Sequence, residues 1–336
     1  MREIIFDAME QLLGDCCSPN HVRRIERGEG GPKERAVLWR ALQESGFTDA
    51  LVAEARGGSG LSLSDAYPIA FVAGRHALPL PLMQTILVRG IMSETNAELP
   101  EGSITIAGDV SVTPDGTVVS NYVPFGEVAD WVLVDFGDRA QLLPATGAQR
   151  HIAGGYGSVN ARMRWTNPSI SGNELPGSHW RAYGACLISA MLAGAMERTL
   201  NMTMGYANDR VQFGRPIAKL QIIQQQVSVM AEQVFAARMA AQVGFSTAGT
   251  RPKLMAAAVA KQRTSEAVGT VSSIAHSVHG AMGFTEEYDL QLFTRRMHEW
   301  RLAYGTEVYW SKIIGRELLA AGESRTLDFV RQSLAG

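Results

Sequence analysis

The chain has 336 residues, of which 46% are hydrophobic and 19% are charged, and its formal net charge is -2. This length and apolar content suffice for two or three packed subdomains. The basic residues are scattered, so the sequence lacks the positive patch of a nucleic-acid binder. Acids interrupt the densest basic group, which spans residues 23–35, and this region is therefore expected to be a solvated loop.

The first ten residues place apolar side chains at helical spacing and interrupt them with Glu3, Asp7 and Glu10, which argues against a secretory signal. No segment approaches the roughly 20 uninterrupted apolar residues of a membrane span. We therefore expect a cytoplasmic protein with no membrane partner. The three cysteines, at positions 16, 17 and 186, fit neither a disulfide framework nor a metal site, and no metal is expected.

A helical pattern dominates residues 1–99, which we interpret as an N-terminal helical domain. Ile5, Met9 and Leu12 share one helix face, a Gly- and Pro-rich loop follows at residues 27–32, and another helix is expected from Glu34. Between residues 100 and 175 the apolar period changes to two. The pairs Ile104/Ile106 and Val110/Val112, the run WVLV at 131–134 and the turn PDG at 114–116 predict a small middle β domain.

The helical period returns in residues 176–336. Three apolar stripes mark three long helices: residues 188, 191, 192, 195, 199 and 202, then 223, 227, 230 and 234, then 268, 271, 275 and 278. Long amphipathic helices of this kind pack as an antiparallel bundle. The predicted fold class is therefore α+β and mainly α, with a helical domain, a middle β domain and a C-terminal four-helix bundle.

Two motifs in the last region carry most of the functional information. The run RVQFGRPI occupies residues 210–217 and is followed by LQIIQQQ at 220–226. The run SVHGAMGFTEEY occupies residues 277–288, and its glycines allow backbone amides to approach a pyrophosphate because no Cβ stands in the way. With the loop GGSGL at residues 57–61, these segments resemble the acyl-CoA dehydrogenase family over nearly the whole chain.

This resemblance implies FAD as cofactor. In the family, the arginine and phenylalanine of the first motif meet the FAD of a neighbouring subunit and a glutamine joins them; here these positions are Arg210, Phe213 and Gln221. The second motif implies cofactor contacts by residues 277, 280 and 281. Ser277 and Ala281 replace the usual glutamine and glycine, whereas Gly280 is kept, and Thr306 is a further expected contact.

The resemblance also implies a catalytic glutamate that removes the α proton of the acyl chain. Its usual position, immediately before Gly-Thr, holds Tyr304, and the alternative position on an earlier bundle helix holds Gly184. A phenol with a pKa near 10 is a poor base at neutral pH. Glu299 and Glu287 remain weak candidates for a substitute base, with Glu286 and Glu307 behind them, and the catalytic residue stays unknown.

The flavin-facing part of the β domain departs from the family as well. A strand hydroxyl that contacts the flavin ring is replaced by Pro124, which also lacks a backbone donor. The positions that contact a subunit's own flavin therefore differ from the family, whereas the positions that contact the flavin of a neighbouring subunit are largely kept. This asymmetry is typical of the base-lacking subunit of α2β2 bacterial acyl-CoA dehydrogenases that act on steroid-derived acyl-CoA.

Three functional hypotheses follow. In the first, the chain completes the FAD site of a catalytic acyl-CoA dehydrogenase subunit, with an acyl-CoA substrate and electron-transfer flavoprotein as electron acceptor. In the second, it is a self-sufficient homo-oligomeric flavoenzyme with a non-standard base. In the third, it is a catalytically silent scaffold with the same fold.

Overall fold

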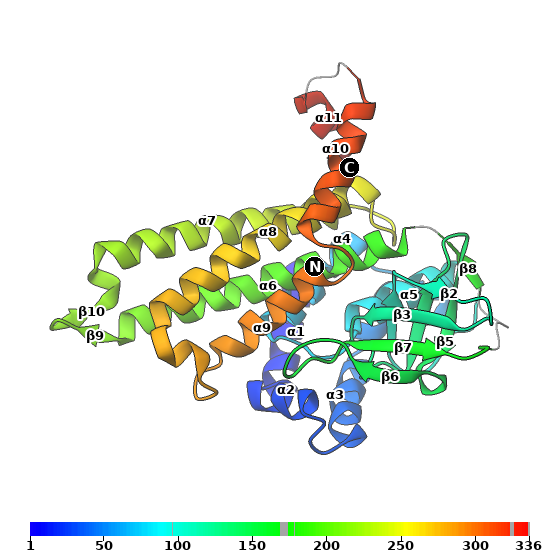
Figure 1. Cartoon of the computed structure of the whole chain (residues 1–336), viewed down its shortest axis with the longest axis horizontal. Coiled ribbons are helices and arrows are strands. Elements are labelled where there is room, and N and C mark those ends of the chain that lie inside the picture. Colours follow the sequence, from blue (N-terminus) through cyan, green and yellow to red (C-terminus); the bar gives the residue numbers. More distant parts are fainter. Residues whose placement is uncertain (96, 169–173, 178, 323–325, 335–336) are drawn as a thin grey trace.

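The computed structural model describes residues 1–95, 97–168, 174–177, 179–322 and 326–334. Helices come first, two small sheets follow, and long helices form the last part of the chain (Figure 1). This order confirms the predicted fold class. No helix in the described ranges combines the length and the apolar character needed to span a membrane.

The N-terminal domain contains five α-helices and two short 3-10 turns, at Phe47–Asp49 and Glu54–Arg56. The helices are α1 (Arg2–Cys16), α2 (Pro19–Glu26), α3 (Pro32–Glu44), α4 (Leu63–Arg75) and α5 (Leu82–Glu94). Local chemistry sets two of the starts: Ser18 and Ser62 each accept a hydrogen bond from a backbone N–H in the first turn of the helix that follows. The helix expected from Glu34 begins two residues earlier, because Pro32 is well suited to a first helical turn.

The middle domain consists of two four-stranded sheets. One has the order β1 (Ile104–Ala107), β4 (Trp131–Asp135), β5 (Arg139–Pro144), β8 (Glu174–Pro176); the other has the order β2 (Ser111–Val112), β3 (Val118–Val123), β7 (Ala161–Trp165), β6 (Gln149–Ile152). β1 and β4 are parallel, whereas the remaining pairs are antiparallel. β8 crosses the expected domain boundary at residue 175 because it pairs with β5.

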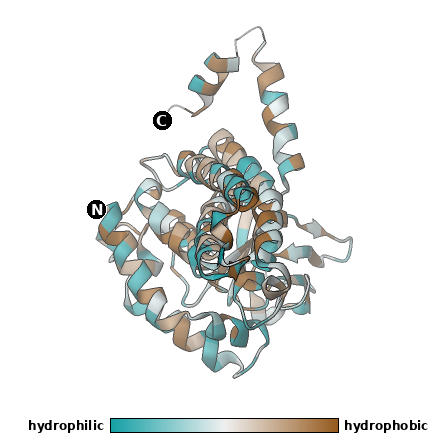
Figure 2. Cartoon of the chain, turned by 90° about the vertical axis from the view of Figure 1, so that its left-hand side faces the viewer, coloured by the Kyte–Doolittle hydropathy of each residue, from teal (hydrophilic) through white to brown (hydrophobic). Residues whose placement is uncertain are grey.

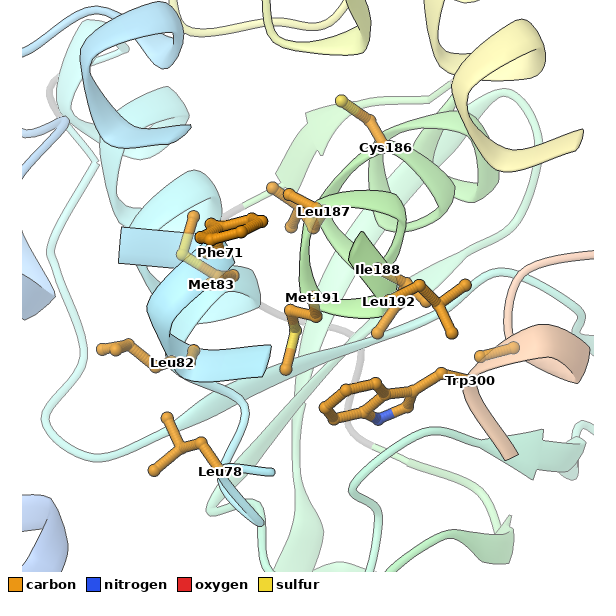
Figure 3. Packing of buried hydrophobic residues seen from close by; sticks show 14 of the residues in the cluster. Phe71, Leu78, Leu82, Met83, Cys186, Leu187, Ile188, Met191, Leu192 and Trp300 are labelled. Atoms are coloured by element: carbon orange, nitrogen blue, oxygen red, sulfur yellow. The ribbon is translucent and has the colours of Figure 1, made fainter. Parts of the chain in front are cut away.

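The C-terminal bundle is built from α6 (Trp180–Asp209), α7 (Gln221–Gly244), α8 (Leu254–His279) and α9 (Leu290–Leu302). The predicted stripe of α6 is buried from Ile188 to Thr199. Figure 3 shows why: α6 side chains pack against Phe71 and Met83 of α4 and α5 on one side and against Trp300 of α9 on the other. The bundle and the N-terminal helices therefore share one core.

Two parts extend beyond the bundle. A short hairpin, β9 (Val211–Gln212) and β10 (Arg215–Pro216), joins α6 to α7 at the left end in Figure 1. α10 (Glu307–Ala320) and α11 (Thr326–Leu334) project upward from the bundle in the same view. Figure 2 views the bundle from its hairpin end, with the ribbon coloured by hydropathy. Ile222, Phe235 and Met239 of α7 are large apolar residues that are more than half exposed. Exposed apolar faces of this kind usually contact other proteins.

Candidate functional site

The first cluster of predicted site residues lies where the hairpin meets the end of α8; we call residues 204–223 and 277–284 the hairpin end. Arg210 follows the last residue of α6, and Phe213 and Gly214 form the hairpin turn with φ of 52° and 76°. Phe213 is 88% exposed, although it is a large apolar residue in a conformation that side chains rarely adopt. The hairpin therefore presents its aromatic ring outward instead of burying it.

The two sequence motifs come together here in space. Ala207, Ile217 and Val278 form a small buried cluster that joins the base of the hairpin to α8. Gln226 of α7 donates a hydrogen bond to the Ser277 hydroxyl at 3.3 Å. Gly280 has a φ of 58° and open space where a Cβ would be, so its backbone is accessible at the surface. Arg210, Phe213, Gln221, Ser277, Gly280 and Ala281 are thus all exposed at one end of the bundle.

An aromatic stack supports the hairpin end from inside. The rings of Tyr206 and His279 stack with centroids 4.4 Å apart, and His279 Nδ1 lies 2.7 Å from the carbonyl oxygen of Ala275. Burial lowers the pKa of His279, so the ring is neutral at pH 7. His279 therefore stabilises the turn from within. Tyr206 carried no sequence signal, because a lone tyrosine on a helix is ordinary.

The second cluster surrounds a cavity of about 330 Å³ between the β domain and the bundle, which we call the central cavity. Tyr304 and Thr306 from the loop before α10, Tyr122 and Pro124 from β3 and the residue after it, and Arg181 from α6 line this space. Thr306 therefore lies apart from the six exposed residues of the hairpin end. The predicted cofactor contacts are divided between two places in one chain.

The two positions where the resemblance implies a catalytic base touch each other beside this cavity. A Cβ on Gly184 would lie 2.6 Å from the Tyr304 ring, so the ring occupies the space next to the helix. Tyr304 has a φ of 57° and donates a hydrogen bond from its hydroxyl to the carbonyl oxygen of Ile106 at 3.1 Å. Burial raises its pKa well above the usual phenol value. Tyr304 therefore fills the site and cannot remove a proton at neutral pH.

The remaining candidate bases have other roles or positions. Glu299 forms an ion pair with Arg296 at 3.3 Å, and it does not line the central cavity. A hydrogen bond from Arg301 lowers the pKa of Glu307, and one from Arg27 lowers the pKa of Glu286. Glu287 is exposed beyond the hairpin end. No carboxylate candidate from the sequence faces Tyr304.

A cation, Arg181, lies in the wall of the central cavity. Arg181 donates to the carbonyl oxygen of Gly108 from Nε and Nη2, at 3.1 and 2.9 Å, and pairs with Asp109 at 3.1 Å. Its guanidinium carbon lies 5.0 Å from the centre of the Tyr309 ring. These contacts join β1, α6 and α10 across the space. Sequence reasoning missed Arg181, because its partners are 72 or more positions away or on another helix.

A buried lysine anchors the loop that carries Tyr304. Lys261 of α8 is fully buried and donates to the carbonyl oxygens of Arg301 and Gly305 at 2.8 and 2.9 Å and to Ser265 Oγ at 2.8 Å. Burial lowers its pKa to about 7. Lys261 satisfies carbonyls at the end of α9 that have no partner within the helix.

The two places differ in their fit to a flavin nucleotide. The hairpin end offers an unpaired guanidinium, an exposed ring and an open glycine backbone, which suit a phosphate-bearing aromatic cofactor. At the central cavity, Pro124 lacks a hydroxyl donor, Tyr304 fills the space beside Gly184, and the Arg181 side chain in the wall is held by Gly108. The residues of the central cavity do not fit a flavin ring, whereas those of the hairpin end fit part of the cofactor.

Comparison with known proteins gives a consistent picture. The family described as "Acyl-CoA dehydrogenase, C-terminal domain" matches residues 182–319. The chain is 28% identical to the acyl-CoA dehydrogenase IpdE2 of Mycolicibacterium smegmatis over 300 residues, which cover 88% of this chain and 92% of that protein.

Two solved structures share the fold. The ChsE4-ChsE5 complex from Mycobacterium tuberculosis superposes with a TM-score of 0.80 and 21% identity, covering 97% of this chain and 98% of the matched chain. A variant of the Tcur3481-Tcur3483 steroid ACAD gives a TM-score of 0.78 and 20% identity, covering 96% and 99%.

Proposed function

Because the chain belongs to the acyl-CoA dehydrogenase family, we propose that it is the base-lacking subunit of an α2β2 flavin-dependent acyl-CoA dehydrogenase. In this proposal a catalytic subunit supplies the base and most of the FAD cradle. The chain described here lends its hairpin end to that partner's FAD. The assembly oxidises an acyl-CoA thioester between its α and β carbons.

One observation carries the proposal: both base positions meet in space and neither holds a carboxylate. Tyr304 packs on Gly184, is buried with 6% of its surface exposed, and donates a hydrogen bond to the carbonyl oxygen of Ile106. An α-proton abstraction needs a group that accepts a proton near neutral pH and lies within reach of the carbon. Among the residues that line the central cavity, Asp109 is a carboxylate, but it pairs with Arg181 at 3.1 Å and lies at neither base position, so the proposal assigns the base to a partner.

The hairpin end has the properties of a half-site awaiting a partner. The Arg210 guanidinium has five N–H donors and no partner among the described residues. Phe213 offers an exposed ring for stacking, and Gly280 offers backbone without a side chain. Bound FAD would supply a hydride acceptor for the β carbon. Arg210 would hold anionic cofactor oxygens, while Phe213 and the Gly280 backbone would position the cofactor and shield it from water.

The surface of α7 near this end supports a protein partner. α7 has 24 residues, among which Glu232 and Arg238 are the charged ones. Ile222 and Val229 are exposed, at 61% and 40%. An exposed helix with so few charges is typical of one that is covered in an assembly. The fold likeness to the ChsE4-ChsE5 complex is consistent with a hetero-oligomer.

We also propose the substrate class and the electron acceptor by analogy. The Tcur3481-Tcur3483 protein is described as a steroid ACAD, so a steroid-derived acyl-CoA is the proposed substrate. Electron-transfer flavoprotein is the proposed acceptor of electrons from the reduced cofactor. Both assignments depend on the partner, because in this chain the Tyr304 ring occupies the space beside Gly184 and no catalytic base is identified.

The two other hypotheses have weaker support. A homo-oligomer with a non-standard base would need an unpaired carboxylate in the central cavity. Glu299 is held by Arg296 and does not line the cavity, and Asp109, which does line it, pairs with Arg181 at 3.1 Å. A silent scaffold would have no need of an unpaired arginine beside an exposed phenylalanine. The hairpin end is what distinguishes a lent half-site from a scaffold.

Flavin content tests the proposal directly. The chain is purified alone and together with a candidate catalytic subunit, and bound FAD is measured by visible absorbance after denaturation. We expect almost no FAD on the chain alone and FAD on the complex. Arg210→Ala is expected to lower the FAD content of the complex at limiting FAD by about tenfold or more, the effect of losing a hydrogen bond to a charged group.

The matched control is Arg162→Ala, which removes an exposed arginine from β7, far from both motifs. It is expected to leave the FAD content unchanged. One FAD per chain in the isolated protein would overturn the lent half-site. A stable complex that never contains FAD would favour the scaffold instead.

A further inference from the structure

A cavity of about 280 Å³ lies between α3 and the β domain, and we call it the α3 groove. Arg35, Trp39, Arg40 and Gln43 line one side of it. These four residues recur at helical spacing and therefore share one face of α3. The α3 groove has no lining residue in common with the central cavity, and none of its residues belongs to the hairpin end.

The lining of the α3 groove carries more positive than negative charge. Asp130 is the acid that lines it, and this carboxylate pairs with Arg35 at 3.7 Å. The same carboxylate accepts hydrogen bonds from the backbone N–H and the hydroxyl of Ser103, both at 2.8 Å. Arg40 has no hydrogen-bond or ion-pair partner among the described residues. One of the two guanidinium groups is therefore left without an anion.

The charges behind the α3 groove do not supply that anion. Arg35 and Arg150 each donate a hydrogen bond to the carbonyl oxygen of Glu127 at 3.4 Å. Burial lowers the pKa of Arg150, while the nearby Glu127 carboxylate opposes this effect. Arg150 and Glu127 thus add one charge of each sign, and the positive charge of Arg40 remains in excess.

A buried donor in the wall of the α3 groove also lacks an acceptor. Trp39 is 8% exposed, and its indole N–H has no hydrogen-bond partner among the described residues. Buried tryptophans usually find an acceptor for this group. Four others in the chain donate it to carbonyl oxygens: Trp131, Trp165, Trp180 and Trp310. The unpaired N–H of Trp39 therefore points to an acceptor that comes from outside the chain.

We propose that the α3 groove binds a small organic anion. Its carboxylate or phosphate group accepts hydrogen bonds from the Arg40 guanidinium and the Trp39 indole N–H, and both kinds of oxyanion match the donors of an arginine. Its apolar part lies against the Trp39 ring and Leu80, which are buried residues of the lining. The volume is close to the lower limit of small-molecule sites, about 300 Å³, so the ligand is small.

This site goes beyond the proposed function, because flavin sharing uses the hairpin end and not α3. It is tested by NMR of the full chain with ¹⁵N-labelled tryptophans, titrated with benzoate and, separately, with phenyl phosphate. The chain has six tryptophans, and Trp39→Phe identifies the indole signal of Trp39 by its loss. We expect at least one probe to shift this signal in a saturable manner, because the N–H gains an acceptor. Sodium chloride at equal ionic strength is the control for screening.

Two variants test the chemistry of the site by calorimetric titration with the probe that binds. Arg40→Gln is expected to weaken binding by about tenfold or more, the effect of losing a hydrogen bond to a charged group. Lys33→Gln is the matched control, because Lys33 is an exposed cation of α3 that does not line the groove, and it should leave the affinity unchanged. Both side chains are exposed, and circular dichroism checks that both variants are folded.

A response to benzoate alone, to phenyl phosphate alone or to both supports the site and identifies the oxyanion it takes. The proposal is overturned if neither probe gives a saturable shift, if chloride reproduces the shift, or if Arg40→Gln binds as well as Lys33→Gln. FAD content separates this outcome from failure of the flavin proposal. Arg40→Gln is expected to leave FAD bound in the complex with the catalytic subunit, whereas Arg210→Ala is expected to release FAD and leave the affinity for the probe unchanged.

Discussion

A single methyl group added at Gly184 is expected to destabilise the chain, although the same change usually stabilises a helix. Replacing glycine by alanine inside a helix gains about 1 kcal/mol. At this position the new Cβ would lie 2.6 to 2.7 Å from three carbons of the Tyr304 ring, which is far inside van der Waals contact. The ring is buried, and its hydroxyl donates a hydrogen bond to the carbonyl oxygen of Ile106, so a shift of the ring away from the new Cβ would break that bond.

Overpacking a core of this kind costs about 1–3 kcal/mol. Because the ring is held in place, we expect an overpacking cost in the upper half of that range. After the gain in helix propensity is subtracted, Gly184→Ala should lower the free energy of unfolding by about 1 kcal/mol. Gly205 on the same helix has no atom within 4 Å of the place where a Cβ would lie, so Gly205→Ala should gain up to about 1 kcal/mol. The two alanine variants should thus differ by about 2 kcal/mol in the free energy of unfolding.

Urea unfolding followed by circular dichroism measures this difference. Adding Tyr304→Ala to Gly184→Ala should remove the clash, so the double variant should be more stable than the sum of the two single losses predicts. If Gly184→Ala stabilises the chain as much as Gly205→Ala does, the contact between Gly184 and Tyr304 is wrong. The view of Tyr304 as the side chain that fills the base position would then fail with it.

Three further outcomes concern buried polar groups. Burial lowers the pKa of His279, so the unfolded chain takes up the proton before the folded chain does, and stability should fall as the pH drops through about 6.5. His279→Phe should reduce this fall, measured as melting temperature against pH. An unchanged pH profile would contradict the reasoning. Burial lowers the pKa of Lys261 to about 7, so the free energy of unfolding should rise from pH 7 towards pH 10. Lys261→Met should abolish that rise. It should also cost about 2 kcal/mol, because the carbonyl oxygens of Arg301 and Gly305 lose their hydrogen-bond donor. The Glu26 side chain is 3% exposed and pairs with Arg295 at 3.0 Å and with Arg296. Glu26→Gln should lower the free energy of unfolding in urea by about 3 kcal/mol. The matched control, Glu29→Gln, changes an exposed side chain and should lower it by almost nothing, so equal effects of the two variants would refute the buried ion pair.

The sequence predicted the layers of this fold because their signals are local. The period of two at residues 104–106 and the 3.6-residue stripe on α6 depend on neighbours along the chain, and both correspond to elements of the structure. The lack of a carboxylate at the two base positions can be read directly from the sequence, because tyrosine and glycine stand there and neither accepts a proton at neutral pH. What no local signal could show is that Tyr304 and Gly184, 120 positions apart, touch.

The parts of the site that escaped prediction depend on contacts between distant segments. Arg181 carries no motif, and its role beside the central cavity follows from where β1 ends and where α10 begins. Lys261 is a single lysine within a helical pattern, and only the position of the loop before α10 makes it an internal cap. The assignment of Arg210, Phe213 and Gln221 to a cofactor stays a prediction, which the measurement of bound FAD tests.

The length of α6 has a consequence for how such a chain changes over evolutionary time. Gly184 lies near its first turn and Arg210 directly follows its last residue, which places the two about 39 Å apart on one straight rod. A substitution that disables the first location leaves the second untouched, because no side chain reaches across that distance. After a gene duplication, one copy can therefore lose its own reaction centre step by step while it still binds the cofactor of the other copy. The functions that one gene once encoded are then divided between two genes.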